Sequence, residues 1–370
     1  MNLVSARWRT EKTISTLFLF TIVVAHQSFS QYEEGLFYRG YSYGTQANYN
    51  PFSFILNGSF DIVQLGKGNN HILKIQYANG AANVFRNISR YPTVIEHYGV
   101  KKFFTTEVFP TSFQLSHAQY WPNYKLHLLG GGISYVGMTE WYSYHGYQYP
   151  KFLSVATMAT LHFLNEVVEN NEYRGETVDP IADLLIFDPA GILIFSIDGV
   201  PEFFSKTLSA ADWSNQPLFQ FSDRSLVNNG QNFSVKIPLP FLKQWKILYT
   251  FGMDGLVGLS YRCNETDNIS VAGGLGAKEL VEVENSPGMR ILTTSLIKKG
   301  GIYYDRNNSL LVSVFLGNSG GYFLKANIYP GVIDIGSLPV GIVFMLLDNY
   351  KISFGISTSF SPIGIAFPVH

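Results

Sequence analysis

The sequence predicts an all-β fold with a helical insert, more specifically an antiparallel transmembrane β-barrel of about 12 strands whose lumen is plugged or capped by helices. Three observations favour this class. The chain opens with a pattern typical of exported proteins. Charged residues make up 14% of the chain and aromatic residues 15%, whereas soluble domains carry about 25% charged residues. Apolar and small residues also alternate along much of the C-terminal half.

Residues 1–30 have the composition of a cleaved signal peptide. Three basic residues precede an apolar run from 14 to 25, and the small residues Ser28 and Ser30 stand before Gln31. The run of roughly 12 apolar residues is shorter than the ~20 that an ordinary membrane helix needs. The alternative is an N-terminal anchor helix. We expect cleavage near Gln31 and a location in the bacterial outer membrane.

Cysteine content and charge exclude some classes. Cys263 is the only cysteine, so a scaffold stapled by intrachain disulfides is excluded. The formal net charge is −1, and no basic stripe points to a nucleic-acid partner. Every long apolar stretch after the signal is interrupted by charge or proline, so the sequence predicts no membrane helix in the mature chain.

The C-terminal strands, in residues 217–370, show the clearest alternation. In "YKISFGISTSF" (350–360), Ile352, Phe354 and Ile356 share one face, while serine and glycine occupy the other. The same period of two runs through 245–262. Asn- and Gly-rich breaks predict hairpins between these strands. They lie at 66–70, 228–232, 264–268, 305–308, 317–321 and 347–349.

A soluble β-protein is the alternative to a membrane barrel. Its solvent face would be rich in Lys, Glu and Thr, whereas the polar face here is mostly Gly, Ser, Ala and Asn. The aromatic residues Trp245 and Tyr261 fall near strand ends, as in an interfacial girdle. Bacterial barrels usually end in an aromatic residue, whereas this chain ends in "FPVH". We expect Phe367 to take the role of that terminal aromatic residue.

Residues 31–149 are predicted to hold the N-terminal barrel strands. The expected strands are 54–63, 72–78, 124–129 and 133–137. Residues 150–216 are predicted to form the helical insert, because 151–170 lack both alternation and helix breakers. Asp179-Pro180 and Asp188-Pro189 each have the sequence of a helix start, with Asp as N-cap and Pro at the first helical position.

The insert also contains the candidate site residues. His162, Glu166 and Glu169 lie at i, i+4 and i+7 and share one helical face. With Asp183, which no capping role explains, they are candidates for acid–base catalysis. The first three are also weak candidates for a metal site. Alternatively they solvate the exposed face of an amphipathic helix or pair with Arg174. No cofactor is expected.

The stretch "HFLNEVVENNEYRGETVDPIADLLIFDPAGILIF" (162–195), between alternating strands and after a signal peptide, resembles a family of uncharacterised bacterial outer-membrane β-barrel proteins with a mid-chain helical Glu/Asp segment. The resemblance implies location and architecture but no activity. The expected function is a non-enzymatic envelope or plugged-pore role, with outer-membrane lipid and a periplasmic protein as partners. The alternative is a membrane-embedded hydrolase or lipid-modifying enzyme that uses the carboxylate and histidine residues.

Overall fold

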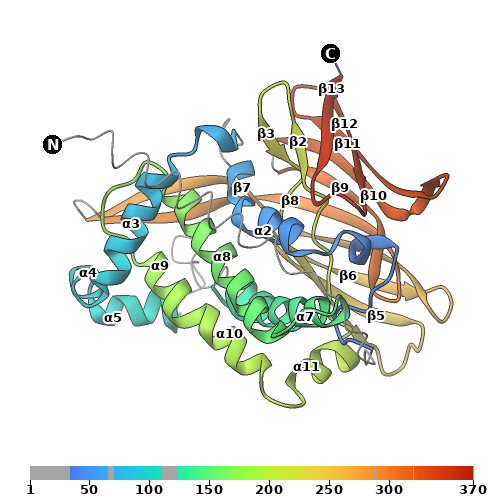
Figure 1. Cartoon of the computed structure of the whole chain (residues 1–370), viewed down its shortest axis with the longest axis horizontal. Helices are drawn as coiled ribbons and strands as arrows, with labels where there is room; N and C mark the ends of the chain where they lie inside the picture. The colour runs from blue at the N-terminus through green and yellow to red at the C-terminus, as the bar shows by residue number, and fades with distance from the viewer. Residues whose placement is uncertain (1–33, 66–70, 110–122, 287–288, 320, 370) are drawn as a thin grey trace.

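The computed structural model describes residues 34–65, 71–109, 123–286, 289–319 and 321–369. The predicted signal peptide lies outside these residues. Among the described residues up to 207 the regular segments are helical, and all described strands follow from 211 onward. Figure 1 shows the two halves side by side, with the helices from blue to green and the sheet from yellow to red.

The helical half combines ordinary helices with short 3₁₀ and π segments. The α-helices are α2 (Pro51–Ser59), α3 (Tyr77–Ser89), α4 (Tyr91–Tyr98), α5 (Val100–Phe103), α7 (Gly131–Tyr144), α8 (Pro150–Asn170), α9 (Asp179–Ala182), α10 (Asp188–Phe195) and α11 (Val200–Glu202). The 3₁₀ segments are η1 (Gly44–Asn48), η2 (Ile62–Leu65) and η3 (Ile72–Lys74). The π segments are η4 (Phe104–Val108), η6 (Asn123–Gly130), η7 (Asp183–Phe187) and η8 (Phe203–Thr207).

Among the described helices, none is by itself long and apolar enough to cross a bilayer. Residues 179–195 together with 200–207 pass that test as a pair, but they are bent by 86° at the break between them.

One sheet contains all 13 strands, in the order β1-β4-β5-β6-β7-β8-β9-β10-β11-β12-β13-β2-β3. The strands are β1 (Ala211–Asp212), β2 (Leu218–Gln220), β3 (Ser225–Val227), β4 (Asn232–Pro238), β5 (Trp245–Gly252), β6 (Asp254–Arg262), β7 (Asp267–Ser286), β8 (Met289–Arg306), β9 (Ser309–Ser319), β10 (Tyr322–Ile335), β11 (Leu338–Leu347), β12 (Ile352–Thr358) and β13 (Gly364–Val369). Neighbours are antiparallel, except that β13 and β2 are parallel.

The prediction of an all-β transmembrane barrel is wrong, because the sheet is mixed and not closed, and helices make up much of the chain. The strands near the two ends of the sheet, β1 and β2, are nevertheless joined directly by one short segment. Residues 213–217 join β1, which pairs with β4, to β2, which pairs with β13. Trp213 donates its backbone N–H to Asn232, and Asn215 donates to Gly230. Pairing partners therefore exist for the backbone near both ends of the sheet.

The predicted N-terminal strands are wrong, since 54–63, 72–78, 124–129 and 133–137 are mainly helical. In the segment 54–63, a helix N-cap just upstream decides for a helix against the strand-like alternation of apolar residues. The side chain of Asn50 accepts hydrogen bonds from the backbone N–H groups of Phe52 and Ser53, and Pro51 occupies the first helical position. The helix predicted at 151–170 and the strands after 217 are confirmed. Strand β1 lies inside the predicted insert of 150–216. The predicted N-caps are wrong, since Asp179 and Asp188 are the first residues of α9 and α10 and the caps are Val178 and Phe187.

The outward face of the sheet carries an unbroken row of apolar side chains across ten strands, called here the outer row. Each member is the register partner of the next. The row is Ile237, Ile247, Leu259, Val271, Ile302, Val314, Ala326, Phe344, Phe354 and Phe367. At its centre Val271 is 57% exposed, more than most apolar side chains in a folded chain.

The inward face is mixed, since polar side chains alternate on it with buried apolar ones such as Leu248, Leu256 and Phe315. Neighbouring register positions hold the buried Ser260, Ser270, Tyr303, Ser313 and Asn327. Lysines are buried on this face as well, and they find partners across the curve of the sheet. Lys236 of β4 lies 2.6 Å from Asp305 of β8, and both side chains are fully buried. A half-solvated antiparallel sheet normally presents polar side chains on its outward face, so the apolar outer row is the unusual feature of this sheet.

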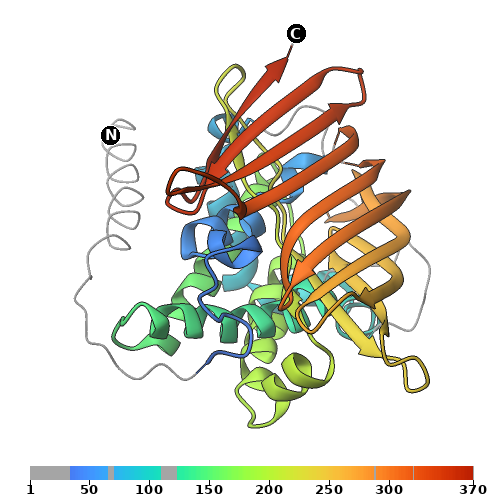
Figure 2. The ribbon, with the colours of Figure 1, turned by 90° about the vertical axis from the view of Figure 1, so that its right-hand side faces the viewer.

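The first part of the helical half packs against this inner face. Figure 2 shows the sheet curving around the first part of the chain, which is drawn in blue. Segment η1 contacts β9 and β10. Asn57 of α2 donates to the carbonyl of Asn215, and Thr45 donates to the carbonyl of Asp212. The predicted insert packs elsewhere on the sheet: Phe195 lies in a cluster with Phe233 and Phe251, which share a strand face with Ile237 and Ile247.

Candidate functional site

Two histidines and three acids meet inside the helical half, and we call them the His–carboxylate centre. They are His127 of η6, His162 and Glu166 of α8, Asp183 of η7 and Asp188 of α10. Four of the residues are at least 93% buried, and the Asp188 side chain is 11% exposed.

His127 lies between two aspartates. Its Nδ1 atom is 2.9 Å from Oδ1 of Asp188, and its Nε2 atom is 3.4 Å from Oδ2 of Asp183. His162 approaches the same Asp188 oxygen, with its Nδ1 atom at 3.4 Å. The two imidazole rings are 4.9 Å apart between centroids.

Local backbone geometry aligns these side chains. Asp183 and Asp188 are five residues apart across the π segment η7, and a π turn places residues i and i+5 one above the other. His162 and Glu166 are one α-helical turn apart. A side chain at Gly191 would meet the carbonyl oxygens of Leu128 and His127 at 2.7 and 2.9 Å. Only glycine therefore lets α10 approach η6 so closely.

Two polar atoms of the centre are buried without a hydrogen-bond partner in the described chain, Nε2 of His162 and Oδ2 of Asp188. Glu166 and Asp183 instead pair with each other, since the protonated carboxyl of Glu166 can donate to Asp183. A buried polar group without a partner costs about 1–3 kcal/mol. The two unpaired atoms therefore indicate capacity for a further ligand.

Burial and mutual charge shift the protonation of the centre. Burial alone lowers the pKa of His127, but the carboxylates of Asp183 and Asp188 outweigh it and raise this pKa to about 10. Burial lowers the pKa of His162 to about 4, since Asp188 compensates only in part. Burial and then the negative charge of Glu169 hold the pKa of Glu166 well above its usual value. One imidazole is thus cationic and the other neutral at pH 7.

A further buried acid, Glu107, lies beside the centre. It accepts a hydrogen bond from Tyr98, and its other carboxyl oxygen has no partner in the described chain. Burial, with the charge of Asp179 second, raises its pKa to about 8. The folded chain therefore holds this proton more tightly than the unfolded chain does. The stability of the fold falls as pH rises from about 4.5 to 8 and stays lower above that range.

Glu107→Gln is expected to stabilise the fold at high pH, because glutamine mimics the protonated acid. We expect a gain of about 1–2 kcal/mol at pH 9 and almost none at pH 5. Denaturant unfolding at the two pH values measures the difference. Glu96→Gln, at an exposed position nearby, is the control and should change neither value. An equal effect of Glu107→Gln at both pH values would contradict the assigned protonation.

The structure brings together three of the four predicted site residues. His162, Glu166 and Asp183 meet in the centre, whereas Glu169 is only partly buried and acts on Glu166 and His127 through its charge. Sequence patterns do not indicate His127, because its segment is predicted to be a strand. Helix capping is the role that the sequence predicts for Asp188, yet its side chain contacts both histidines.

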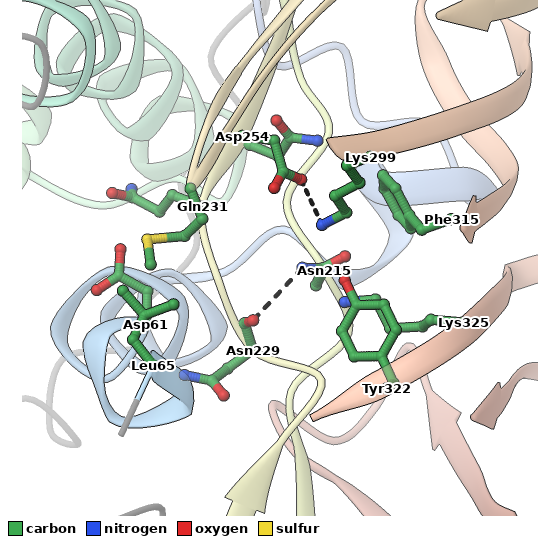
Figure 3. A pocket seen from close by; sticks show the side chains of 12 residues that line it. Asp61, Leu65, Asn215, Asn229, Gln231, Asp254, Lys299, Phe315, Tyr322 and Lys325 are labelled. Carbon is green, nitrogen blue, oxygen red and sulfur yellow. Dashed lines mark hydrogen bonds and ion pairs between the residues drawn. The ribbon is translucent and has the colours of Figure 1, made fainter. Parts of the chain in front are cut away.

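A separate polar pocket lies where the helical half meets the sheet (Figure 3). Lys299, whose Nζ atom is 2.6 Å from Asp254, and Lys325 extend into it from the sheet, opposite Asp61 and Leu65. The amide side chains of Asn215, Asn229 and Gln231 line the remainder. No residue of the His–carboxylate centre lines this pocket. This pocket is therefore distinct from the His–carboxylate centre.

Comparisons with known proteins give no relative: no family model, no curated protein and no solved structure matches this chain. The similarity to outer-membrane proteins therefore stays a prediction from the sequence.

Proposed function

We propose that this chain is a lipid-facing envelope protein of the bacterial outer membrane, in which the first part of the helical half covers the inner face of the sheet. The observation that carries the proposal is the exposed apolar outer row of the sheet. An apolar row ten strands wide faces outward, while serines, asparagines and ion-paired lysines face inward. Exposed apolar patches of this extent mark contact with lipid or a partner.

Two further features support the proposal that lipid rather than water surrounds the outward face of the sheet. Unpaired backbone groups are not tolerated in hydrocarbon. Ser225 and Leu226 of the edge strand β3 are completely buried, as is Trp213 directly after the other edge strand, β1. Trp245 and Tyr261 are register partners at strand ends with rings 5.0 Å apart, where an interfacial aromatic belt would lie. The export pattern of residues 1–30 is consistent with this location.

Cell fractionation tests the proposal. The full chain, expressed in a Gram-negative bacterium, should sediment with the outer membrane and remain there after a concentrated urea wash. An export-deficient form lacking residues 1–30 serves as the control and should not reach that fraction. Recovery of the full chain as a soluble periplasmic protein would refute the proposal.

A second candidate function is a membrane-embedded hydrolase or lipid-modifying enzyme. The observation that favours it is the convergence of His127, His162 and Asp188 with shifted protonation, as in acid–base sites. Lipid profiles of cells carrying Asp183→Ala or Glu166→Ala distinguish the two functions. Altered membrane lipids would favour the enzyme, and unchanged lipids with altered permeability would favour the envelope role.

A further inference from the structure

We propose that the His–carboxylate centre binds one divalent transition-metal ion through His127, His162 and Asp188. One ligand atom from each of these residues lies within 4.8 Å of the other two. Metal–ligand bonds of about 2.0–2.2 Å place the ligand atoms of a tetrahedral site roughly 3.3–3.6 Å apart. The observed separations of 2.9 Å and 3.4 Å from Oδ1 of Asp188 to the two histidines are on this scale.

Asp183 is not one of the proposed metal ligands but contacts one of them, His127. If Nδ1 of His127 binds the metal, the opposite nitrogen can donate its N–H to Oδ2 of Asp183, 3.4 Å away. Histidine ligands of metals almost always donate their second nitrogen in this way, which fixes the ring and its tautomer. Asp183 is therefore a positioning residue.

Asp188 and His162 have capacity for a further ligand. Oδ2 of Asp188 is buried without a partner in the described chain, so this carboxylate can bind a cation with both oxygens. His162 is 96% buried with Nε2 unpaired in that part of the chain, so the ring can carry its proton on Nε2 and offer Nδ1 to a metal. The ion pairs found there for Asp183 and Asp188 are with histidines only, and a divalent cation would compensate the two aspartates.

The donor set defines the class of metal. Two imidazoles and a carboxylate suit Zn²⁺, Fe²⁺, Mn²⁺ or Co²⁺, whereas Ca²⁺ and Mg²⁺ require mostly oxygen ligands. Three protein ligands also leave one position of a tetrahedral site open, as catalytic zinc sites do. The metal proposal is independent of the lipid-facing proposal, because its residues all lie in the helical half.

Titration of the purified, metal-free full chain with Zn²⁺ tests the site. We expect one Zn²⁺ per chain, measured by elemental analysis after desalting. His127→Ala and His162→Ala should each weaken binding by at least 100-fold, and Asp183→Asn by 10–100-fold. His97→Ala, at an exposed histidine paired with Glu176, is the matched control and should bind like the wild type.

Titration with Co²⁺ keeps the proposal testable if an alanine variant fails to fold. The wild type should give the intense visible absorption of tetrahedral Co²⁺, saturating at one equivalent. His162→Cys should retain Co²⁺ and add a thiolate charge-transfer band. Failure of the wild type to bind either ion stoichiometrically would overturn the proposal, as would equal binding by wild type, His127→Ala and His162→Ala.

Discussion

Asp305→Ala is expected to lower the free energy of unfolding by about 3–5 kcal/mol. The carboxylate of Asp305 lies 2.6 Å from Nζ of Lys236, and neither side chain is exposed. Removal of Asp305 would leave a lysine charge buried over the Trp213 ring, 5.0 Å from its centroid. The pair joins β4 to β8, so its loss also weakens the curvature of the sheet. Denaturant unfolding in detergent micelles measures the effect.

A double-mutant cycle separates this ion pair from simple loss of packing. Lys236→Met combined with Asp305→Asn should cost much less than the sum of the single changes, because no unpaired charge remains. Lys278→Ala is the control, since Lys278 forms an ion pair with Glu279 in which both side chains are more than 40% exposed. It should cost less than about 1 kcal/mol. Strictly additive effects of the two buried changes would contradict the account.

Val271→Arg is expected to destabilise the chain in lipid vesicles by about 2–4 kcal/mol. Val271 is at the centre of the outer row, between Leu259 and Ile302. If lipid covers this row, the arginine must desolvate or distort the bilayer. In a water-soluble protein the same change at a side chain that is 57% exposed would be nearly neutral. The free energy of unfolding in vesicles therefore distinguishes the two environments.

Phe241→Arg is the matched control for this experiment. Phe241 is 95% exposed in the turn between β4 and β5, beyond the end of the outer row. Arginine near a membrane interface costs only about 0–1 kcal/mol. Equal effects of Val271→Arg and Phe241→Arg would show that no apolar phase covers the centre of the sheet.

The C-terminal strands could be predicted from sequence because their two faces differ. In β12, apolar Ile352, Phe354 and Ile356 alternate with serine and glycine, and the structure exposes the former and buries the latter. The same reasoning failed before residue 150, where short apolar runs such as 52–56 fit both periods. There Asn50-Pro51 is the deciding signal, and it is a helix start rather than a strand boundary. Without those N-terminal strands the predicted closed barrel does not form.

The sequence predicts only those residues of the candidate site whose local pattern is informative. Helical spacing alone places His162 and Glu166 on one face, and the buried charge of Asp183 indicates a partner. That partner, His127, is distant in sequence and lies in a π segment, which has no strong sequence signal. The π segment η7 likewise aligns Asp188 with Asp183, whereas its Asp-Pro sequence indicates only a helix start. Tertiary packing, not local pattern, completes the centre.

Spin-label accessibility in lipid bilayers tests the central claim, that lipid covers the outer row, most directly. In a Cys263→Ser background, nitroxide labels at Leu259, Val271 and Ile302 would report on the outer row, and a label at Phe241 on the turn. The account predicts that molecular oxygen reaches the three outer-row labels readily while a water-soluble nickel chelate does not, with the opposite result at Phe241. Equal collision with the nickel chelate at all four positions would contradict it.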